Sequence, residues 1–384
     1  MPLIPRERVL MSINHEQPDR VPIIVGTSNT TSMKMSTYQR LKRLINISSE
    51  EHYIYDWPEL GTALPDEATL QRLHSDARGV LDRFPAWVYE RNQNRPQGSP
   101  FIDDWKGGQS ETSPGVWYPG VHPFQEATTL KEIEDFEWPD MNDPTRVAHV
   151  RAQARALHKD TNYAVIGTPW LLFPFERAHA MQGLANFLMN MSLHPDFAEA
   201  LLLKITDLCK ILMGHFLEEA GENIDIIKIG DDLGTQASLM ISPKMYRRML
   251  KPMHADFIQF IKQRTNAKVF FHTDGDVFDL IPDFIEIGVD ILNPIQTSAG
   301  KMSDLPELKK RYGDKLTFCG AVDTHRVLPT GTPAEVRDEV RRVQEILAPG
   351  GGYMLAPVHT IMDDVPPENI LAMVDAVIEG APNS

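Results

Sequence analysis

The sequence predicts an α/β fold: a single (β/α)8 TIM barrel with an irregular insertion in the N-terminal third. Apolar, β-branched runs alternate with amphipathic helical stretches, which is the pattern of parallel βαβ units. No Gly-rich phosphate loop follows the first run, so an open dinucleotide-binding sheet is disfavoured. The chain has 384 residues, 42% of them hydrophobic, which is enough to bury one large core.

Seven runs have the composition of strands, and an eighth is expected within the irregular residues 52–120, because the barrel needs eight. The seven are VPIIV (21–25), NYAVIG (162–167), IDIIKIG (224–230), KVFFH (268–272), VDILNP (289–294), LTFCGA (316–321) and GYMLAP (352–357).

The stretches between these runs predict helices with clear starts and stops. Residues 242–263 begin with Ser-Pro and keep Met, Leu and Phe at helical spacing. Thr332 is a predicted cap, with Pro333 in the first turn and Glu335 at the capping-box offset. Residues 366–380 predict a last helix that stops at Gly380.

The irregular stretch 52–140 is dense in Pro, Gly, Trp and Asp and has poor periodicity. It has two interpretations: surface excursions from the barrel, or a lid that frames the substrate, since long ordered loops are often functional. No repeat, low-complexity tail or linker divides the chain, so we predict one domain over residues 1–384.

Composition excludes several classes of protein. The formal net charge of -15 disfavours nucleic acid as a partner, because phosphates would be repelled. Two cysteines, Cys209 and Cys319, cannot build a disulfide framework. The start lacks the apolar core of a signal peptide, and no apolar run reaches the roughly 18 residues of a membrane span. We therefore expect a cytoplasmic protein.

Polar residues recur at the ends of the predicted strands in the last third of the chain. In a parallel barrel these ends converge on the face where chemistry is done. Two His, one Asp and one Cys there form a plausible zinc ligand set. The candidate residues are His272, Asp274, Asn293, Gln296, Cys319 and His359.

Each candidate has a plainer alternative. Asp274 could share a metal with His272 or orient it as a general base, and His272 could instead be bonded within its own loop. A lone cysteine such as Cys319 is usually a small buried hydrophobe. His359 closes the run after the last strand and has the same two interpretations as His272. The shared position at consecutive strand ends favours function.

Three acidic residues add to this predicted face. Asp231 and Asp232 follow one strand and could hold a cation, bind a substrate donor or act as acid and base, or cap the next helix. Glu176 follows the strand 162–167 and could be a fourth ligand, a proton donor or part of a loop salt bridge.

Several long segments resemble the uroporphyrinogen decarboxylase superfamily. They are RERVLMSINHEQPDRVPI, KIGDDLGTQASLMISPKMYRRMLKP, FFHTDGDVFDLIPDFIEIGVDILNPIQ, RYGDKLTFCGAVDT and GGGYMLAPVHTIMDDVPPENILA. The resemblance runs from about residue 5 to the C-terminus and implies a (β/α)8 barrel. It implies one of two activities: tetrapyrrole decarboxylation without a cofactor, or zinc-dependent methyl transfer involving a corrinoid protein.

The methyltransferase branch resembles this chain more closely. The decarboxylases carry an arginine-rich signature after the first strand, whereas this chain has no arginine between Arg20 and Arg40. Several substrate carboxylates would need several guanidinium partners. The thiol-methylating members carry His-x-Cys at one strand end and a later Cys, where this chain has Asp274 and His359. Similarly varied ligands occur in the enzymes that demethylate methyl ethers, especially methoxylated aromatics.

The resemblance therefore implies methyl transfer from a methyl ether to the cob(I)amide of a separate corrinoid protein, because the D-x-H-x-x-G pattern of a corrinoid module is absent. Three of His272, Asp274, Cys319 and His359 would hold zinc. Asp231, Asp232 and Glu176 would be catalytic, and Asn293 and Gln296 would bind substrate. The superfamily contains monomers and homodimers. A decarboxylase-like lyase, a thiol or amine methyltransferase and a non-catalytic binding barrel remain alternatives.

Overall fold

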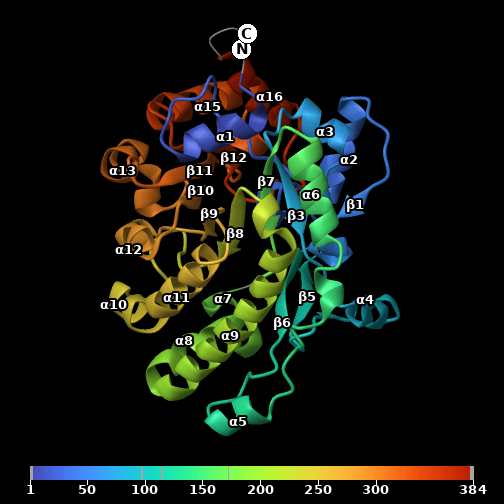
Figure 1. Cartoon of the computed structure of the whole chain (residues 1–384), viewed down its shortest axis with the longest axis vertical. Coiled ribbons are helices and arrows are strands. Elements are labelled where there is room, and N and C mark those ends of the chain that lie inside the picture. The colour runs from blue at the N-terminus through green and yellow to red at the C-terminus, as the bar shows by residue number, and fades with distance from the viewer. Residues whose placement is uncertain (1–2, 97, 114–115, 172, 381–384) are drawn as a thin grey trace.

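The computed structural model describes residues 3–96, 98–113, 116–171 and 173–380. Its centre is a curled sheet of seven parallel strands in the order β12-β11-β10-β9-β8-β7-β3 (Figure 1). The strands are β3 (Ala77–Leu81), β7 (Ala164–Thr168), β8 (Ile226–Gly230), β9 (Lys268–His272), β10 (Ile291–Ile295), β11 (Thr317–Val322) and β12 (Tyr353–Pro357). The predicted α/β barrel architecture is confirmed, and β3 is the strand expected within 52–120.

Residues 21–25 complete the ring between β12 and β3, although they do not form the predicted strand. Ile23 makes one parallel bridge to Leu355, and the Asp76 N–H donates to the Ile23 carbonyl over 2.8 Å. The Ile23 N–H donates instead to the Asp76 carboxylate, and the Val25 N–H to the Ser75 hydroxyl. Side chains thus take the N–H groups that a regular ladder would use.

One end of the barrel is closed and the other carries the polar strand ends. Helix α1 (Pro5–Ile13) inserts Val9 and Ile13 into the interior cluster at the amino ends of the strands. Alternate strand residues fill that interior because successive side chains point to opposite faces. They are Ile24, Ala77, Ala164, Ile166, Ile226, Phe270, Ile291, Cys319, Met354 and Ala356.

Helices cover the outside of the sheet. They are α2 (Met35–Leu44), α3 (Glu67–Arg72), α6 (Val150–Asp160), α9 (Pro195–Ala220), α11 (Lys251–Lys262), α12 (Ile281–Ile287), α13 (Leu305–Tyr312), α15 (Pro333–Leu347) and α16 (Pro367–Glu379). The predicted cap at Thr332 is confirmed, since its hydroxyl accepts from the Glu335 N–H. The helix predicted over 242–263 is interrupted: α10 (Pro243–Met245) passes through a π-helical turn before α11.

The stretch 52–140 is folded. It contains the hairpin of β1 (His52–Tyr53) and β2 (Ala63–Leu64), the helices α4 (Ala86–Gln93) and α5 (Leu130–Asp135), and an antiparallel sheet of β4 (Phe101–Ile102), β5 (Gly108–Ser113) and β6 (Val116–Val121). Figure 1 places α5 at the end of the molecule opposite α1, with β5 and β6 in the same half as α5. This insertion therefore lies toward the carboxyl ends of the strands.

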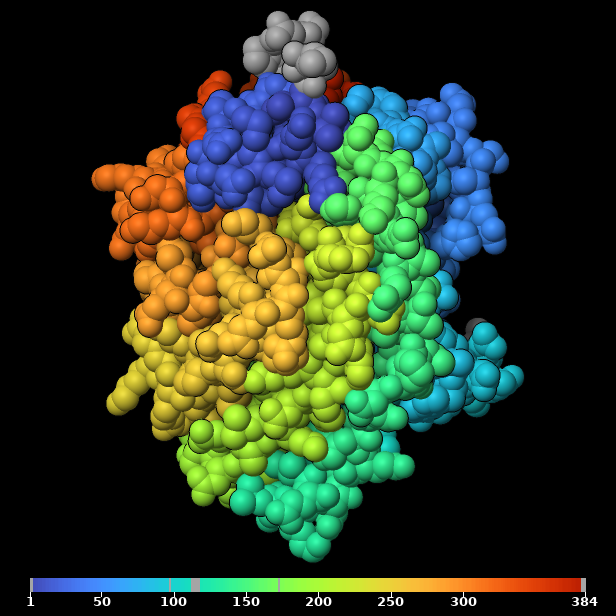
Figure 2. All heavy atoms as spheres, viewed as in Figure 1, coloured from blue at the N-terminus to red at the C-terminus, as the bar shows by residue number. Residues whose placement is uncertain are grey.

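The insertion packs against both barrel and helices. Tyr55, Trp57, Phe84 and Phe101 form a cluster with Leu81 at the end of β3. In Figure 2 the insertion lies directly against the helices that follow β7. These include α7 (Phe175–Gln182) and α8 (Leu184–Leu193).

No helix in the described ranges has the length and hydropathy of a membrane span.

Candidate active site

Three side chains converge at the carboxyl ends of β9 and β12. His272 ends β9, Asp274 follows two residues later, and His359 lies two residues beyond β12. One ligand atom from each lies within 4.8 Å of the others. His272 Nε2 is 3.9 Å from Asp274 Oδ1, and His359 Nε2 is 3.8 Å from Asp274 Oδ2. The structure thus brings three of the four predicted ligands together.

Asn293 fixes the orientation of His272. In the register of β9 and β10 the two residues are partners, and His272 Nδ1 lies 2.6 Å from Asn293 Oδ1. The Asn293 amide nitrogen donates to the Cys319 carbonyl, which leaves its oxygen to accept from Nδ1–H. The lone pair of His272 is then on Nε2, the atom that faces Asp274. Asn293, predicted to bind substrate, is bonded in this structure as a positioning residue for His272.

The loop that carries Asp274 is held from both sides. Gln296 Oε1 accepts from the Gly275 N–H over 2.7 Å, and Asp232 Oδ1 accepts from the Asp274 N–H over 2.9 Å. Gly275 has φ +88°, and a Cβ there would come 2.4 Å from the carbonyl carbon of Gly234. Only glycine allows this approach of two backbones. The predicted substrate contact Gln296 therefore shapes the loop in this structure.

The electrostatics of the group favour metal binding. Burial lowers the pKa of His272 well below its ordinary value and that of His359 to about 4, so both imidazoles are neutral at pH 7. Asp274 Oδ1 is buried without a hydrogen-bond partner. A buried acceptor left unpaired is costly unless something binds it. Two neutral His and one carboxylate are a ligand set that suits zinc with an open position.

Cys319 does not join this group, so it is the one of the four candidate ligands that the structure leaves apart. Its side chain belongs to the apolar interior of the barrel, where it is paired in register with Met354. Burial raises the pKa of the Cys319 thiol, which disfavours the thiolate that a metal requires. Cys319 is therefore the small buried hydrophobe of the alternative interpretation.

Asp231 anchors a helix. It is fully buried and accepts from the N–H groups of Phe175 and Glu176 over 3.1 and 2.7 Å. His254 Nε2 lies 2.9 Å from the same carboxylate. Burial raises the pKa of Asp231 well above its ordinary range and lowers that of His254 to about 3. Asp231, predicted to be catalytic, thus holds the first turn of α7. Its contact with His254 was not predictable from the sequence.

Glu176 and Asp232 lie within electrostatic range of Asp274, a member of the group formed by His272, Asp274 and His359. Burial, followed by the Asp232 charge, raises the pKa of Glu176 well above its ordinary value. Burial and the Asp274 charge raise the pKa of Asp232 to about 7. Asp232 Oδ1 is 4.0 Å from His272 Nε2. Both acids can therefore carry a proton near neutral pH, as a general acid must.

Lys228 is a site residue that the sequence reasoning missed. Burial lowers its pKa to about 8, and the charges of Glu176, Asp232 and Asp274 act in the opposite direction. The signal was available: alternation along IIKIG places Lys228 on the same face as the interior residue Ile226.

Residues 27–32, which follow the extended residues 21–25, carry several neutral hydroxyl groups. Thr27, Ser28, Thr30, Thr31 and Ser32 are all buried. The Thr27 and Thr31 hydroxyls are 3.0 Å apart, and the hydroxyl of Thr360, next to His359, donates to the Asn29 carbonyl over 2.8 Å. This buried segment, in the region where the resemblance would place arginines, contains none.

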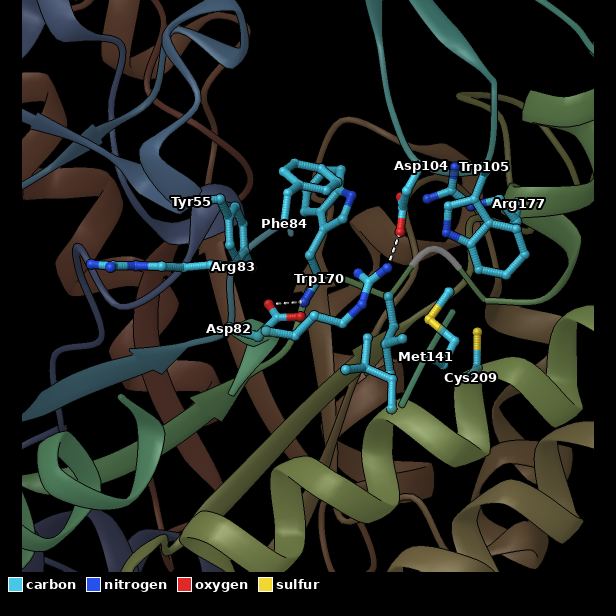
Figure 3. Close-up of a pocket in the computed structure, with 13 residues that line it drawn as sticks. Tyr55, Asp82, Arg83, Phe84, Asp104, Trp105, Met141, Trp170, Arg177 and Cys209 are labelled. Carbon is cyan, nitrogen blue, oxygen red and sulfur yellow. Dashed lines mark hydrogen bonds and ion pairs between the residues drawn. The ribbon is translucent and has the colours of Figure 1, made fainter. Parts of the chain in front are cut away.

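A cavity lies between the insertion and the barrel (Figure 3). Asp82 accepts from the Trp170 N–H over 2.7 Å, and Asp104 pairs with Arg146. Asp104 Oδ1 and Arg177 Nε, on two of its lining residues, are buried without hydrogen-bond partners. None of the three grouped ligand residues lines this cavity.

Comparisons with known proteins agree with this architecture. The model of the uroporphyrinogen decarboxylase (URO-D) family matches residues 116–380. Uroporphyrinogen decarboxylase of Legionella pneumophila (strain Lens) is 26% identical over 219 residues, which cover 56% of this chain and 58% of that protein. The methylated-thiol–coenzyme M methyltransferase of Methanosarcina mazei is 23% identical over 211 residues, which cover 54% of this chain and 53% of that protein. The matches thus span little more than half the length of these relatives.

A solved structure, a methyltransferase from Methanosarcina mazei, aligns over nearly the whole chain. The alignment covers 98% of this chain and 99% of that one, with a TM-score of 0.64 and 18% sequence identity. The two proteins share a fold.

Proposed function

The chain belongs to the uroporphyrinogen decarboxylase family, and from this premise we propose that it is a zinc-dependent methyltransferase. Its methyl donor would be a methyl ether, specifically a methoxylated aromatic, and its acceptor the cob(I)amide of a separate corrinoid protein. The observation that carries the proposal is the group of His272, Asp274 and His359, with two neutral imidazoles and an unpaired carboxylate oxygen.

In this proposal His272 Nε2, Asp274 and His359 hold the zinc ion, and Asn293 keeps His272 in the ligating tautomer. When bound, zinc supplies a Lewis acid at the ether oxygen, where negative charge develops as the methyl group leaves. An aspartate in place of a thiolate makes the ligand set harder, which suits an oxygen-bearing substrate.

Glu176 is the proposed proton donor to the leaving oxygen. Its pKa is raised by burial, so the carboxyl group holds a proton near neutral pH. Asp231 holds the backbone of Glu176 in place through its N–H group. Asp232 accepts a hydrogen bond from the Asp274 N–H, and its negative charge helps to raise the pKa of Glu176.

Decarboxylation of a polycarboxylate is disfavoured by the residues around the site. Five of the six residues 27–32 carry buried hydroxyls, and none of the six is an arginine. Arg177, next to Glu176, is buried against Asp103 at 2.7 Å and lies over the Trp105 ring. One nitrogen of that guanidinium is therefore already in an ion pair. The Methanosarcina relative makes a thiol methyl donor the second candidate.

The first test is zinc content by mass spectrometry on protein prepared without chelators. We expect about one zinc per chain in the wild type and its loss in His272→Ala and His359→Ala. His325→Ala is the matched control, because His325 is 53% exposed and is not among the three grouped residues. Cys319→Ala should also keep zinc. Wild-type protein that neither contains nor takes up zinc would overturn the metal assignment.

The second test is turnover with a corrinoid protein in its cob(I) state, followed by the visible spectrum of the corrinoid. A methoxylated benzoate should methylate the cobalt only when the zinc-loaded wild-type chain is present. Transfer from a methylated thiol but not from any methoxyaromatic would favour the second candidate. Decarboxylation of a tetrapyrrole by zinc-free protein would overturn the proposal.

A further inference from the structure

Lys228 projects into the barrel one layer below the metal group. On β8, Ile226 belongs to the interior cluster, whereas Ile227 and Ile229 belong to the outer core. Alternation therefore places Lys228 on the inner face with Ile226. In the register of β8 and β9, Lys228 is the partner of Phe270, and Gly230 is the partner of His272.

Gly230 lies two residues after Lys228 on the same face of β8, so no side chain of β8 stands between Lys228 and the carboxyl end of that strand. A Cβ at position 230 would come 2.9 Å from the Cβ of His272, so a larger residue would disturb the ligand. With glycine at 230, the Lys228 ammonium is close enough to act electrostatically on Glu176, Asp232 and Asp274.

The Lys228 ammonium has no hydrogen-bond or ion-pair partner within the described ranges. Two other lysines with little exposure are bonded: Lys42 Nζ donates to the Ser49 carbonyl over 2.6 Å, and Lys34 Nζ to the Leu60 carbonyl over 2.8 Å. Lys228 is half-buried, and a cation partly withdrawn from water without a partner costs free energy. Such a group is well placed to donate to a ligand, because its three N–H groups are uncommitted.

We propose that Lys228 binds an oxyanion of the methyl donor, so that the substrate is an anionic methoxyaromatic rather than a neutral one. This inference rests on the proposed function and deepens it. The oxyanion could be a ring carboxylate or a phenolate, since both accept charge-assisted hydrogen bonds from an ammonium.

The charges of the loaded site agree with an anionic ligand. A divalent ion on Asp274 leaves one positive charge, and the ammonium of Lys228 adds another. Asp232 supplies at most one negative charge, and Glu176 is neutral when protonated. With Glu176 protonated, the loaded site therefore keeps at least one positive charge, although the chain as a whole carries a formal net charge of -15.

The test is calorimetric binding of three probes to the zinc-loaded full chain: 3-methoxybenzoate, a nitrated 2-methoxyphenol that is ionised at the assay pH, and neutral methoxybenzene. The variants are Lys228→Met, which keeps length without charge, Lys228→Arg, which keeps charge, and Lys244→Met. Lys244 is an exposed matched control.

We expect the wild type to bind at least one anionic probe tenfold or more tightly than methoxybenzene. Lys228→Met should lose that preference and keep its zinc and its affinity for methoxybenzene within about twofold. Lys228→Arg should keep part of the preference, and Lys244→Met all of it. If Lys228→Met loses affinity for 3-methoxybenzoate, the oxyanion that Lys228 binds is a carboxylate. If it loses affinity for the nitrated methoxyphenolate, the oxyanion is a phenolate.

The proposal is overturned if neither anionic probe binds the wild type, if Lys228→Met keeps the preference, or if it weakens all three probes equally. A Lys228-dependent anion preference without methyl transfer to any corrinoid protein would contradict the proposed function while leaving the binding role of Lys228 intact.

Discussion

At the scale of single residues, the proposed zinc site depends on a side chain that is not one of the proposed ligands. His272 can offer Nε2 only while its other nitrogen is bonded, and Asn293 makes that bond at 2.6 Å. Partners of this kind orient the imidazole and keep it in one tautomer. Asn293 is itself fixed by the Cys319 carbonyl, so β9, β10 and β11 all contribute to one ligand.

We predict that Asn293→Ala weakens zinc binding by about 10- to 100-fold, the usual effect of removing such a partner. Competition with a chelating dye would measure the dissociation constant. Asn369→Ala is the control, because this buried asparagine bonds the Leu328 and Gly331 carbonyls away from the site and should affect stability only. Equal zinc affinity in wild type and Asn293→Ala would show that His272 needs no such support.

The sequence indicated the three residues that converge in this structure better than it indicated their surroundings. His272, Asp274 and His359 were predictable because each follows a recognisable strand, and strand ends meet at one face of a barrel. Cys319 fell within its strand, where only the packing of the interior decides between ligand and core. Lys228 was overlooked because a lysine in an apolar run resembles an outward-facing residue until the inward face of the strand is known.

At the scale of elements, the adjacent carboxylates after β8 have different tasks. Asp231 connects β8 to α7 and α11 by accepting from two N–H groups of α7 and bonding His254 of α11. A negative or strongly polar group at a helix N-terminus also stabilises that helix. Asp232 instead holds the loop that carries Asp274.

We predict that Asp231→Asn lowers the free energy of unfolding by about 1–3 kcal/mol, because an amide nitrogen would face a buried N–H donor. Asp232→Asn keeps the oxygen that accepts from the Asp274 N–H and removes a carboxylate whose charged form is disfavoured by burial, so it should leave the free energy of unfolding unchanged or raise it. Urea unfolding of both variants, with zinc content measured in parallel, checks the contrast. Equal stability of the two variants would contradict the anchoring role of Asp231.

The elements themselves were largely predictable, and the exceptions have physical causes. Six strands, β7 to β12, coincide with the predicted apolar runs. The seventh, β3, has the sequence ARGVL, which gives no such signal. The run 21–25 is apolar enough for a strand, but the side chains of Ser75 and Asp76 take its N–H groups. Such competition depends on tertiary contacts and is invisible in local sequence.

At the scale of the whole molecule, the insertion is joined to the barrel by buried charges. Asp103 pairs with Arg177 of α7, and Asp104 pairs with Arg146. Asp82, at the end of β3, lines the same cavity and is 2% exposed (Figure 3). Buried ion pairs contribute little net stability but are costly when one partner is left alone. The junction should therefore respond to the protonation of its unpaired acid.

That acid is Asp82. Burial raises its pKa from 3.8 to about 7, so the folded protein binds more protons than the unfolded chain between these values. Stability must then fall as pH rises from about 4 to about 7, and it does not fall further on this account above pH 7. The full contribution is about 4 kcal/mol, since one pKa unit corresponds to about 1.4 kcal/mol.

We predict that Asp82→Asn removes this dependence, because asparagine keeps the oxygen that accepts from Trp170 and carries no charge. The free energy of unfolding of the variant, minus that of the wild type, should rise between pH 5 and pH 7 and then level off. Urea titrations at pH 5, 6, 7 and 8 measure the difference. The control is Asp207→Asn, at an exposed position, which should give a constant difference. A constant difference for Asp82→Asn would contradict the prediction. It would mean that Asp82 is ionised in the folded protein throughout this range, with its charge stabilised by the arginines of the junction.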